Sequence, residues 1–96
     1  MVGGSSARSQ TVAALDIIAD ALHALGGSLS DVVRTRIMVK NEADAEEVSR
    51  AHGWAFGCVG VRPTNSFVTA GLIGSQFLVE IEAEAELGLN GVLSVA

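Results

Sequence analysis

Four glutamates alternate with apolar residues near the end of the chain, and this pattern restricts the fold more than any other in the sequence. Within residues 76–86, Glu80, Glu82, Glu84 and Glu86 stand at two-residue spacing. Such alternation is typical of a β-strand with one buried and one exposed face. Alanine and glutamate also favour helices, so a helix over residues 82–87 is an alternative. The clean separation of apolar from acidic positions favours the strand.

A second alternating segment carries the opposite charge. Residues 31–40 predict a half-buried strand, with one face made of Val33, Thr35, Ile37 and Val39. Its other face carries Arg34, Arg36, Met38 and Lys40. A row of like charges repels itself, so the glutamate row is either a solvated face or is neutralised by this basic row. The two rows would meet within one chain or across a subunit boundary, where Arg34, Arg36 and Glu82 would be interface residues.

A metal site is the third interpretation of the glutamate row, and the spacing disfavours it. Neither His23 nor His52 has ligand spacing to the acids, and each lies in a predicted helix. We expect His52 to be a surface or boundary residue of its helix, and Trp54 to be a packing or interface residue. Cys58 is expected to be an inert thiol near a helix end.

Two helices are predicted from apolar residues at three- and four-residue steps. The first is capped by Ser9 or Thr11 and ended by Gly26-Gly27, and its buried face is Leu15, Ile18, Leu22 and Leu25. The second starts near Asn41 and ends at Gly57, and its apolar stripe is Ala45, Val48, Ala51, Ala55 and Phe56.

The segment after the second helix predicts a β-hairpin. Residues 58–63 are expected to be a loop, and the strands 66–73 and 76–86 are separated by Gly74-Ser75, a recognised two-residue turn signal. The resulting register would place Val68 opposite Ile81 and Phe67 opposite Glu82. Asn65, Phe67 and Thr69 would then share one sheet face with the glutamate row.

These elements predict one α+β domain over residues 1–96, with both helices on one face of the sheet. Residues 1–7 are expected to be a flexible start. Residues 88–96 form either a mobile tail or, at Val92-Leu93-Ser94-Val95, a short edge strand.

Composition excludes several classes of protein. A net charge of −5 argues against binding to a phosphate backbone, and a single cysteine excludes an intrachain disulfide. The start of the chain lacks the pattern of a signal peptide, and the longest uncharged run is too short to span a bilayer. We therefore expect a cytoplasmic protein that binds neither nucleic acid nor membrane.

Three stretches of the sequence match the pattern of a known family: Val32-Val33-Arg34-Thr35, Arg62-Pro63-Thr64-Asn65-Ser66-Phe67-Val68 and Val79-Glu80-Ile81-Glu82-Ala83. From Val32 onward the chain thereby resembles the RidA/YjgF family of small trimeric proteins. Gln10-Thr11 resembles the family's helix start. The elements also follow the family's order, so the likeness covers residues 9–86.

This resemblance implies a chorismate-mutase-like α+β fold, in which a mixed sheet carries two helices on one face. It also implies a homotrimer with ligand clefts between neighbouring subunits, and no cofactor. Active members hydrolyse reactive enamines and imines to keto acids and ammonia. That chemistry needs a cation for the substrate carboxylate and a polarised water that attacks the imine carbon.

The chain departs from the family at the residues that matter for this chemistry. The position of the family's carboxylate-clamping arginine is Asn65, and the small residue two places later is Phe67. Glu80 matches the family's cleft glutamate and is the candidate for polarising water or substrate. Arg62 is a candidate substitute for the clamp. The candidate ligand-binding residues are therefore Asn65, Ser66, Phe67, Glu80 and Arg62.

The family's N-terminal strand pair has no counterpart in this chain, so an open sheet edge would have to be covered by the tail or by a partner. The resemblance, together with these departures from the family's pattern, leaves three candidate functions. The favoured one is a trimeric small-molecule-binding protein without standard imine deaminase activity, whose ligand is a small organic molecule such as a carboxylate. The alternatives are an enamine/imine deaminase and a structural interaction module. Endoribonuclease activity is disfavoured, because the chain is acidic and has no tyrosine.

Overall fold

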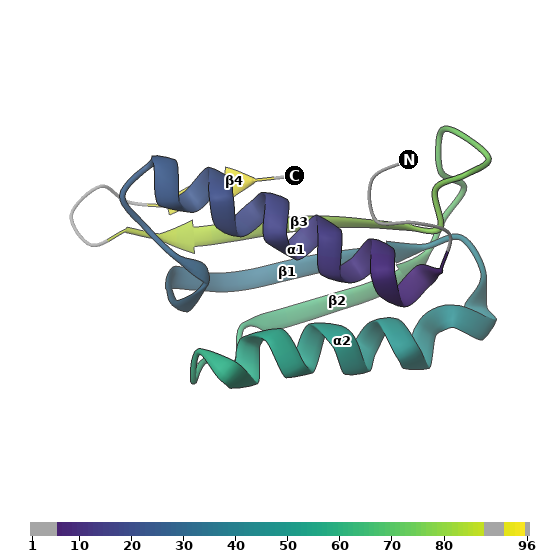
Figure 1. The fold of residues 1–96 in the computed structure, drawn as a ribbon, viewed down its shortest axis with the longest axis horizontal. Coiled ribbons are helices and arrows are strands. Elements are labelled where there is room, and N and C mark those ends of the chain that lie inside the picture. The colour runs from purple at the N-terminus through teal and green to yellow at the C-terminus, as the bar shows by residue number, and fades with distance from the viewer. Residues whose placement is uncertain (1–5, 88–91, 96) are drawn as a thin grey trace.

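The fold is a mixed β-sheet with two α-helices packed over one of its faces (Figure 1). The computed structural model describes residues 6–87 and 92–95. In chain order these residues form α1 (Ala7–Ala24), the 3₁₀ turn η1 (Leu29–Asp31), β1 (Val32–Val39), the 3₁₀ turn η2 (Glu42–Asp44), α2 (Ala45–Cys58), β2 (Thr64–Thr69), β3 (Val79–Glu86) and β4 (Val92–Val95). The α+β class, the two helices and the mixed sheet are confirmed.

The sheet has the order β2-β1-β3-β4, which makes the predicted hairpin wrong. β2 pairs with β1 in parallel, and β3 pairs with β1 antiparallel, so β2 and β3 lie on opposite sides of β1. The physical reason is the helix α2 between β1 and β2, which is the crossover that a parallel pair requires. Residues 70–78 then pass from β2 across to β3. Gly74, with φ +94°, lies in this long connection and not in a two-residue turn.

The true register also reverses the predicted face of β2. Ile37 of β1 pairs with Phe67 on one side and with Ile81 on the other, so all three share the helix-facing side of the sheet. Phe67 packs against the core, whereas Val68 points to the open side and is 38% exposed. Residues opposite each other in a sheet share a face, and a different partner strand therefore reassigns every side chain of β2.

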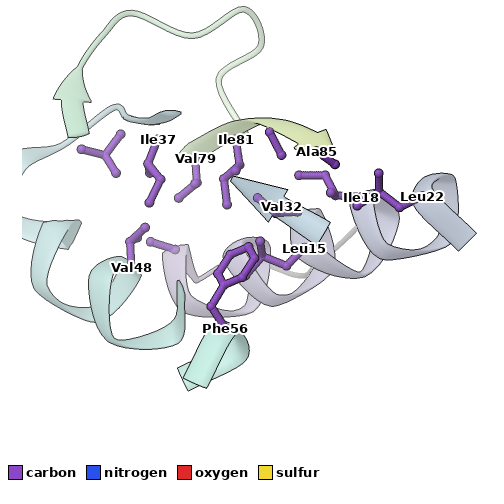
Figure 2. Packing of buried hydrophobic residues seen from close by; sticks show 13 residues of the cluster. Leu15, Ile18, Leu22, Val32, Ile37, Val48, Phe56, Val79, Ile81 and Ala85 are labelled. Atoms are coloured by element: carbon purple, nitrogen blue, oxygen red, sulfur yellow. The ribbon is translucent and has the colours of Figure 1, made fainter. Parts of the chain in front are cut away.

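The core lies between the helices and the sheet (Figure 2). Figure 2 shows Leu15, Ile18 and Leu22 of α1 and Val48 and Phe56 of α2 facing the side chains of the strands. Three of the four residues predicted for the buried face of α1 are therefore confirmed. The prediction that Leu25 is buried is wrong, because Leu25 follows the last helical residue and is 54% exposed.

The start of α1 differs slightly from expectation, and its end at Gly26-Gly27 is confirmed. Ser6, and not Ser9 or Thr11, caps α1: its side chain accepts a hydrogen bond from the Ser9 amide. Gly26 ends the helix at φ +88°, and the Gly27 amide donates to the Leu22 carbonyl at 2.8 Å, as expected for a glycine C-terminal motif.

The second helix is α2, which runs to Cys58, one residue past the expected end at Gly57. Cys58 is exposed, and it belongs to the helix and not to the loop that follows.

A bulge at the start of β1 changes the side on which its first residues point. The register between β1 and β3 shifts between Val32 and Arg34. As a result Val32 is buried and Val33, predicted to be inside, is 42% exposed. Thr35, Ile37 and Val39 are fully buried, as the alternation predicts.

Gln10 attaches the long connection to the first helix. Its Nε2 donates to the Gln76 carbonyl at 2.9 Å, and its Oε1 accepts from the Leu78 amide at 2.8 Å. Gln10 is buried, so these bonds satisfy the oxygen and nitrogen of its own side-chain amide, which would otherwise lose water without compensation. The contact fixes where β3 begins.

β4 covers only part of the outer edge of β3. It pairs with residues 83–86 of β3, so the C-terminal segment forms the edge strand that was one of two alternatives for it. In the part of the chain that the structure describes, residues 79–82 of β3 have no strand on that side.

Candidate functional site

The open face of the sheet brings the basic and acidic rows together within one chain. Arg34 lies opposite Glu84 and Arg36 opposite Glu82, and Glu80 lies opposite Met38. Arg34 Nη1 donates to Glu84 Oε1 at 2.8 Å, with side chains 42% and 36% exposed. At such exposure an ion pair contributes about 0–1 kcal/mol. The pairing therefore explains the two charge rows mainly by removing repulsion.

Glu80 stands at the edge of a hollow beside the uncovered part of β3. This cavity has a volume of about 540 Å³ and is lined mostly by apolar side chains, among them Ile17 of α1 and Ile73 and Phe77 of the connection. Ile73 is 98% exposed and Phe77 is 40% exposed. Glu80 is thus an exposed carboxylate beside an apolar surface, an arrangement that can hold an apolar group next to a hydrogen-bond acceptor.

A chain of three polar side chains crosses the helix-facing side from α2 to β2. Thr35 Oγ1 lies 2.8 Å from His52 Nε2 and donates to Asn65 Oδ1 at 3.1 Å. Thr35 is fully buried, His52 is 7% exposed, and Asn65 is exposed at the sheet edge. We call His52, Thr35 and Asn65 the relay. It connects the interior to Asn65, one of the predicted ligand-binding residues.

His52 is a core residue, which corrects the prediction that it lies at the surface or boundary of its helix. Its ring lies 4.7 Å from that of Phe56, centroid to centroid, and Val48 one turn earlier is fully buried. Burial removes water from the charged form and lowers the pKa of His52 below its ordinary value. His52 is therefore held neutral, with its hydrogen bond to Thr35 as its compensation for burial.

The lowered pKa predicts a pH-dependent stability. The unfolded chain protonates His52 near pH 6.5 and the folded chain at lower pH, so between these values the unfolded state binds more protons. The free energy of unfolding is expected to be highest above about pH 6.5 and to fall as the pH drops toward the folded pKa, by at most about 1.4 kcal/mol per pH unit. Urea titrations at pH 7.5, 6.5 and 5.5 measure this fall.

The matched control for this pH series is His52→Gln, which keeps a side-chain N–H donor and does not titrate. The carboxylates and His23 are the same in both proteins, so the difference between the two curves isolates His52. Identical pH dependence in both proteins would contradict the account of His52 as a buried neutral group.

The structure separates the residues that the predicted hairpin had placed together. Asn65 and Phe67 lie on the helix-facing side, whereas Glu80, Glu82 and Ser66 lie on the open side. Arg62 is exposed in the loop before β2. Within one chain, Asn65 and Glu80 are therefore not parts of a single site. They lie on opposite faces, with β1 between their strands.

The sequence patterns missed Thr35 and His52 as functional candidates. Thr35 stood out only as the one polar residue on an apolar strand face. His52 follows Val48 by four residues and precedes Phe56 by four, which places it on the buried stripe of α2. This four-residue spacing was the signal in the sequence from which the burial of His52 could have been predicted.

The described part of the chain shows neither a metal site nor a membrane-spanning helix. Residues 6–87 and 92–95 contain no group of three His, Cys, Asp or Glu side chains arranged to hold a metal ion. No described helix is both long and apolar enough to cross a bilayer. Trp54 was predicted to be a packing or interface residue. It is 73% exposed, so it does not pack in the core of its own chain, and the interface role stays a prediction.

Comparison with known proteins assigns the chain to a recognised group. The family model described as Endoribonuclease L-PSP matches residues 1–87. An uncharacterized protein from Streptomyces coelicolor is 34% identical over 89 residues, which is 92% of this chain and 65% of that protein. The chain therefore spans just under two thirds of the length of this relative.

Solved structures give the same assignment. A member of the highly conserved YjgF/YER057c/UK114 family from Mycobacterium tuberculosis is 44% identical with a TM-score of 0.81, over 85% of this chain and 69% of that one. A YjgF family member from Neisseria meningitidis is 27% identical with a TM-score of 0.79, over 85% and 68% of the two chains. A protein of the conserved Rid family from Yersinia pestis is 32% identical with a TM-score of 0.75, over 88% and 65%.

Proposed function

The chain belongs to the YjgF/RidA/L-PSP family, and from this membership we propose that it is a trimeric small-molecule-binding protein that lacks standard imine deaminase activity. Its ligand is a small organic molecule that presents a carbonyl or carboxylate oxygen to Asn65. No cofactor takes part. The binding clefts lie between subunits.

The observation that carries this proposal is the setting of Asn65. It occupies the position at which the resemblance places the family's arginine, and its carbonyl oxygen is already engaged by Thr35. An asparagine amide donates hydrogen bonds but carries no charge. The nearby arginine of β1, Arg34, is bound to Glu84 on the other face of the sheet. Residue 65 therefore keeps a hydrogen-bond donor, the asparagine amide, but lacks the positive charge that an arginine would supply.

Assembly of several subunits is supported by the separation of Asn65 from Glu80. Asn65 lies on the edge strand β2, and Glu80 lies on the part of β3 whose outer side is uncovered in the described residues. Asn65 of one subunit can approach Glu80 only if that glutamate belongs to a second copy of the chain. The exposed side chains of Ile73, Phe77 and Val68 provide apolar surface for such contacts.

Thermal melting with a small panel of metabolites tests the proposal. A compound present at ten times its Kd stabilises the folded state by about 1.4 kcal/mol, which raises the Tm by several degrees in a domain of this size. We expect such a rise with at least one of 2-oxobutyrate, pyruvate and their amides, and its loss in Asn65→Leu. Val59→Ala, away from the relay, is the control. An unchanged Tm with every compound of the panel would contradict the proposal.

Light scattering on the same protein tests the assembly. A single species with three times the chain mass is expected. A monomer would contradict the intersubunit clefts, and an open-ended distribution would favour a structural interaction module instead.

Deaminase activity is the second candidate, and one observation favours it. Glu80 is exposed beside a cavity of about 540 Å³, as a residue that polarises a water would need to be.

A further inference from the structure

We propose that His52 is a positioning residue that acts through the Thr35 hydroxyl and holds the Asn65 amide with its NH₂ group facing outward. The group received at Asn65 is then a hydrogen-bond acceptor, and a neutral carbonyl oxygen serves there as well as a carboxylate. This inference rests on the proposed ligand site at Asn65 and names what determines its specificity.

The argument begins with the single proton of the Thr35 hydroxyl. Asn65 Oδ1 is an acceptor only, so the hydroxyl must give its proton to it across the 3.1 Å contact. His52 Nε2, at 2.8 Å from the same oxygen, must then be the donor. The neutral ring is therefore the Nε2–H tautomer, and the relay runs His52 to Thr35 to Asn65.

The opposite direction is the only other complete arrangement of these bonds. If the Asn65 amide were rotated by half a turn, its nitrogen would donate to Thr35, and Thr35 would donate to His52 Nε2. His52 would then carry its proton on Nδ1, and Asn65 would present its carbonyl outward. One tautomer thus corresponds to an outward NH₂ group, and the other tautomer to an outward carbonyl.

The inner end of the relay is rigid and its outer end is accessible. Thr35 is fully buried, and His52 is fixed between that hydroxyl and the ring of Phe56, which is 2% exposed. Asn65 Nδ2 has no protein partner within the residues that the structure describes, and Asn65 is exposed. The packing of α2 on the sheet therefore fixes the positions of His52 and Thr35, and the tautomer of His52 decides which end of the amide a ligand meets.

The chemistry of the outward group sets the class of ligand. Two neutral N–H donors bind a carbonyl oxygen or a carboxylate, but without the charge-assisted gain that an arginine gives to a carboxylate. We therefore expect 2-oxobutanamide to bind with a Kd within threefold of that of 2-oxobutyrate. An outward carbonyl would accept hydrogen bonds and would bind neither oxygen group.

Nitrogen NMR of the imidazole tests the relay without any ligand. The spectrum distinguishes a protonated from an unprotonated ring nitrogen, so it reports the tautomer of His52 directly, with His23 assigned by the His23→Gln variant. Protonated Nε2 and unprotonated Nδ1 at pH 7.5 are expected. A protonated Nδ1 would overturn the proposal.

Binding of 2-oxobutanamide and 2-oxobutyrate to four variants tests the effect on specificity. Thr35→Val and His52→Phe remove one link of the relay each, and both are expected to weaken binding of either probe at least fivefold. Thr35→Ser and His52→Gln keep a hydroxyl and an N–H donor, and both are expected to bind within twofold of the wild type. Circular dichroism melting selects the temperature at which every variant is folded.

The outcomes separate this proposal from the function on which it rests. Equal binding by all four variants would overturn the positioning role while leaving the ligand site intact. A wild-type protein that binds neither probe, yet shows the Nε2–H tautomer, would overturn the ligand site and support the orientation of Asn65.

Discussion

Replacing Phe56 by alanine is expected to lower the free energy of unfolding by about 3–5 kcal/mol, the typical cost of emptying a large aromatic site in a core. Phe56 is 2% exposed and is the largest of the fully buried side chains (Figure 2). It packs against the ring of His52, so the substitution also removes the support of the relay. Small domains are stable by only about 5–15 kcal/mol, and the variant should be close to unfolding at 37 °C. Urea denaturation at one fixed protein concentration measures the loss.

Trp54→Ala is the matched control for Phe56→Ala, because it removes a larger aromatic side chain from the same helix at a position that is 73% exposed. We expect a change within about 0.5 kcal/mol. Phe56→Leu should lie between the wild type and Phe56→Ala. Equal losses at Phe56 and Trp54 would show that the packing of α2 described here is wrong.

Period and capping patterns predicted the elements whose structure is decided locally. The alternation around Ile37 and Val39 gave the position and inner face of β1, and the steps from Leu15 to Leu22 gave the buried side of α1. The same rule failed at Val33, because a bulge shifts the register before Arg34. A bulge leaves no mark in the apolar pattern of a single strand.

Pairing between strands could not be predicted from the turn signal alone. Gly74-Ser75 is a good local hairpin signal, yet the pairing was decided by contacts distant in sequence. The helix α2 is the crossover between β1 and β2, and β3 pairs with β1 over the shared core. The opposite charges of the basic and acidic rows were already consistent with neighbouring strands, and β1 and β3 are neighbours. The predicted hairpin did not conflict with this, because it did not specify where β1 lies in the sheet.

The candidate site was only partly predictable for the same reason. Asn65 was identified by the resemblance, which places the family's arginine at this position, but its sheet face depends on the partner of β2, and that partner is β1. Thr35 and His52 join Asn65 only once α2 is folded onto the sheet. Polar contacts of this kind depend on three elements at once, and no periodic pattern records them.

Hydrolysis of 2-imino acids is expected to be absent, because the charge that holds the substrate carboxylate is missing at Asn65. Hydrogen bonds to charged groups contribute about 1.5–3 kcal/mol each, so replacing a two-bond charged clamp by the neutral donors of Asn65 costs up to roughly 6 kcal/mol. Each 1.4 kcal/mol is tenfold in rate, which makes the expected loss up to about 10⁴-fold. Glu80 alone does not replace this contribution, since it bears the same sign of charge as the substrate.

The most direct test is a coupled assay in which 2-iminobutyrate is generated in situ and the release of 2-oxobutyrate and ammonia is followed. The wild-type protein and Glu80→Gln are compared with buffer over a tenfold range of protein concentration. We expect all rates to equal that of buffer. Release that increases with wild-type concentration and disappears in Glu80→Gln would contradict the central claim that this chain binds small molecules without deaminating imines.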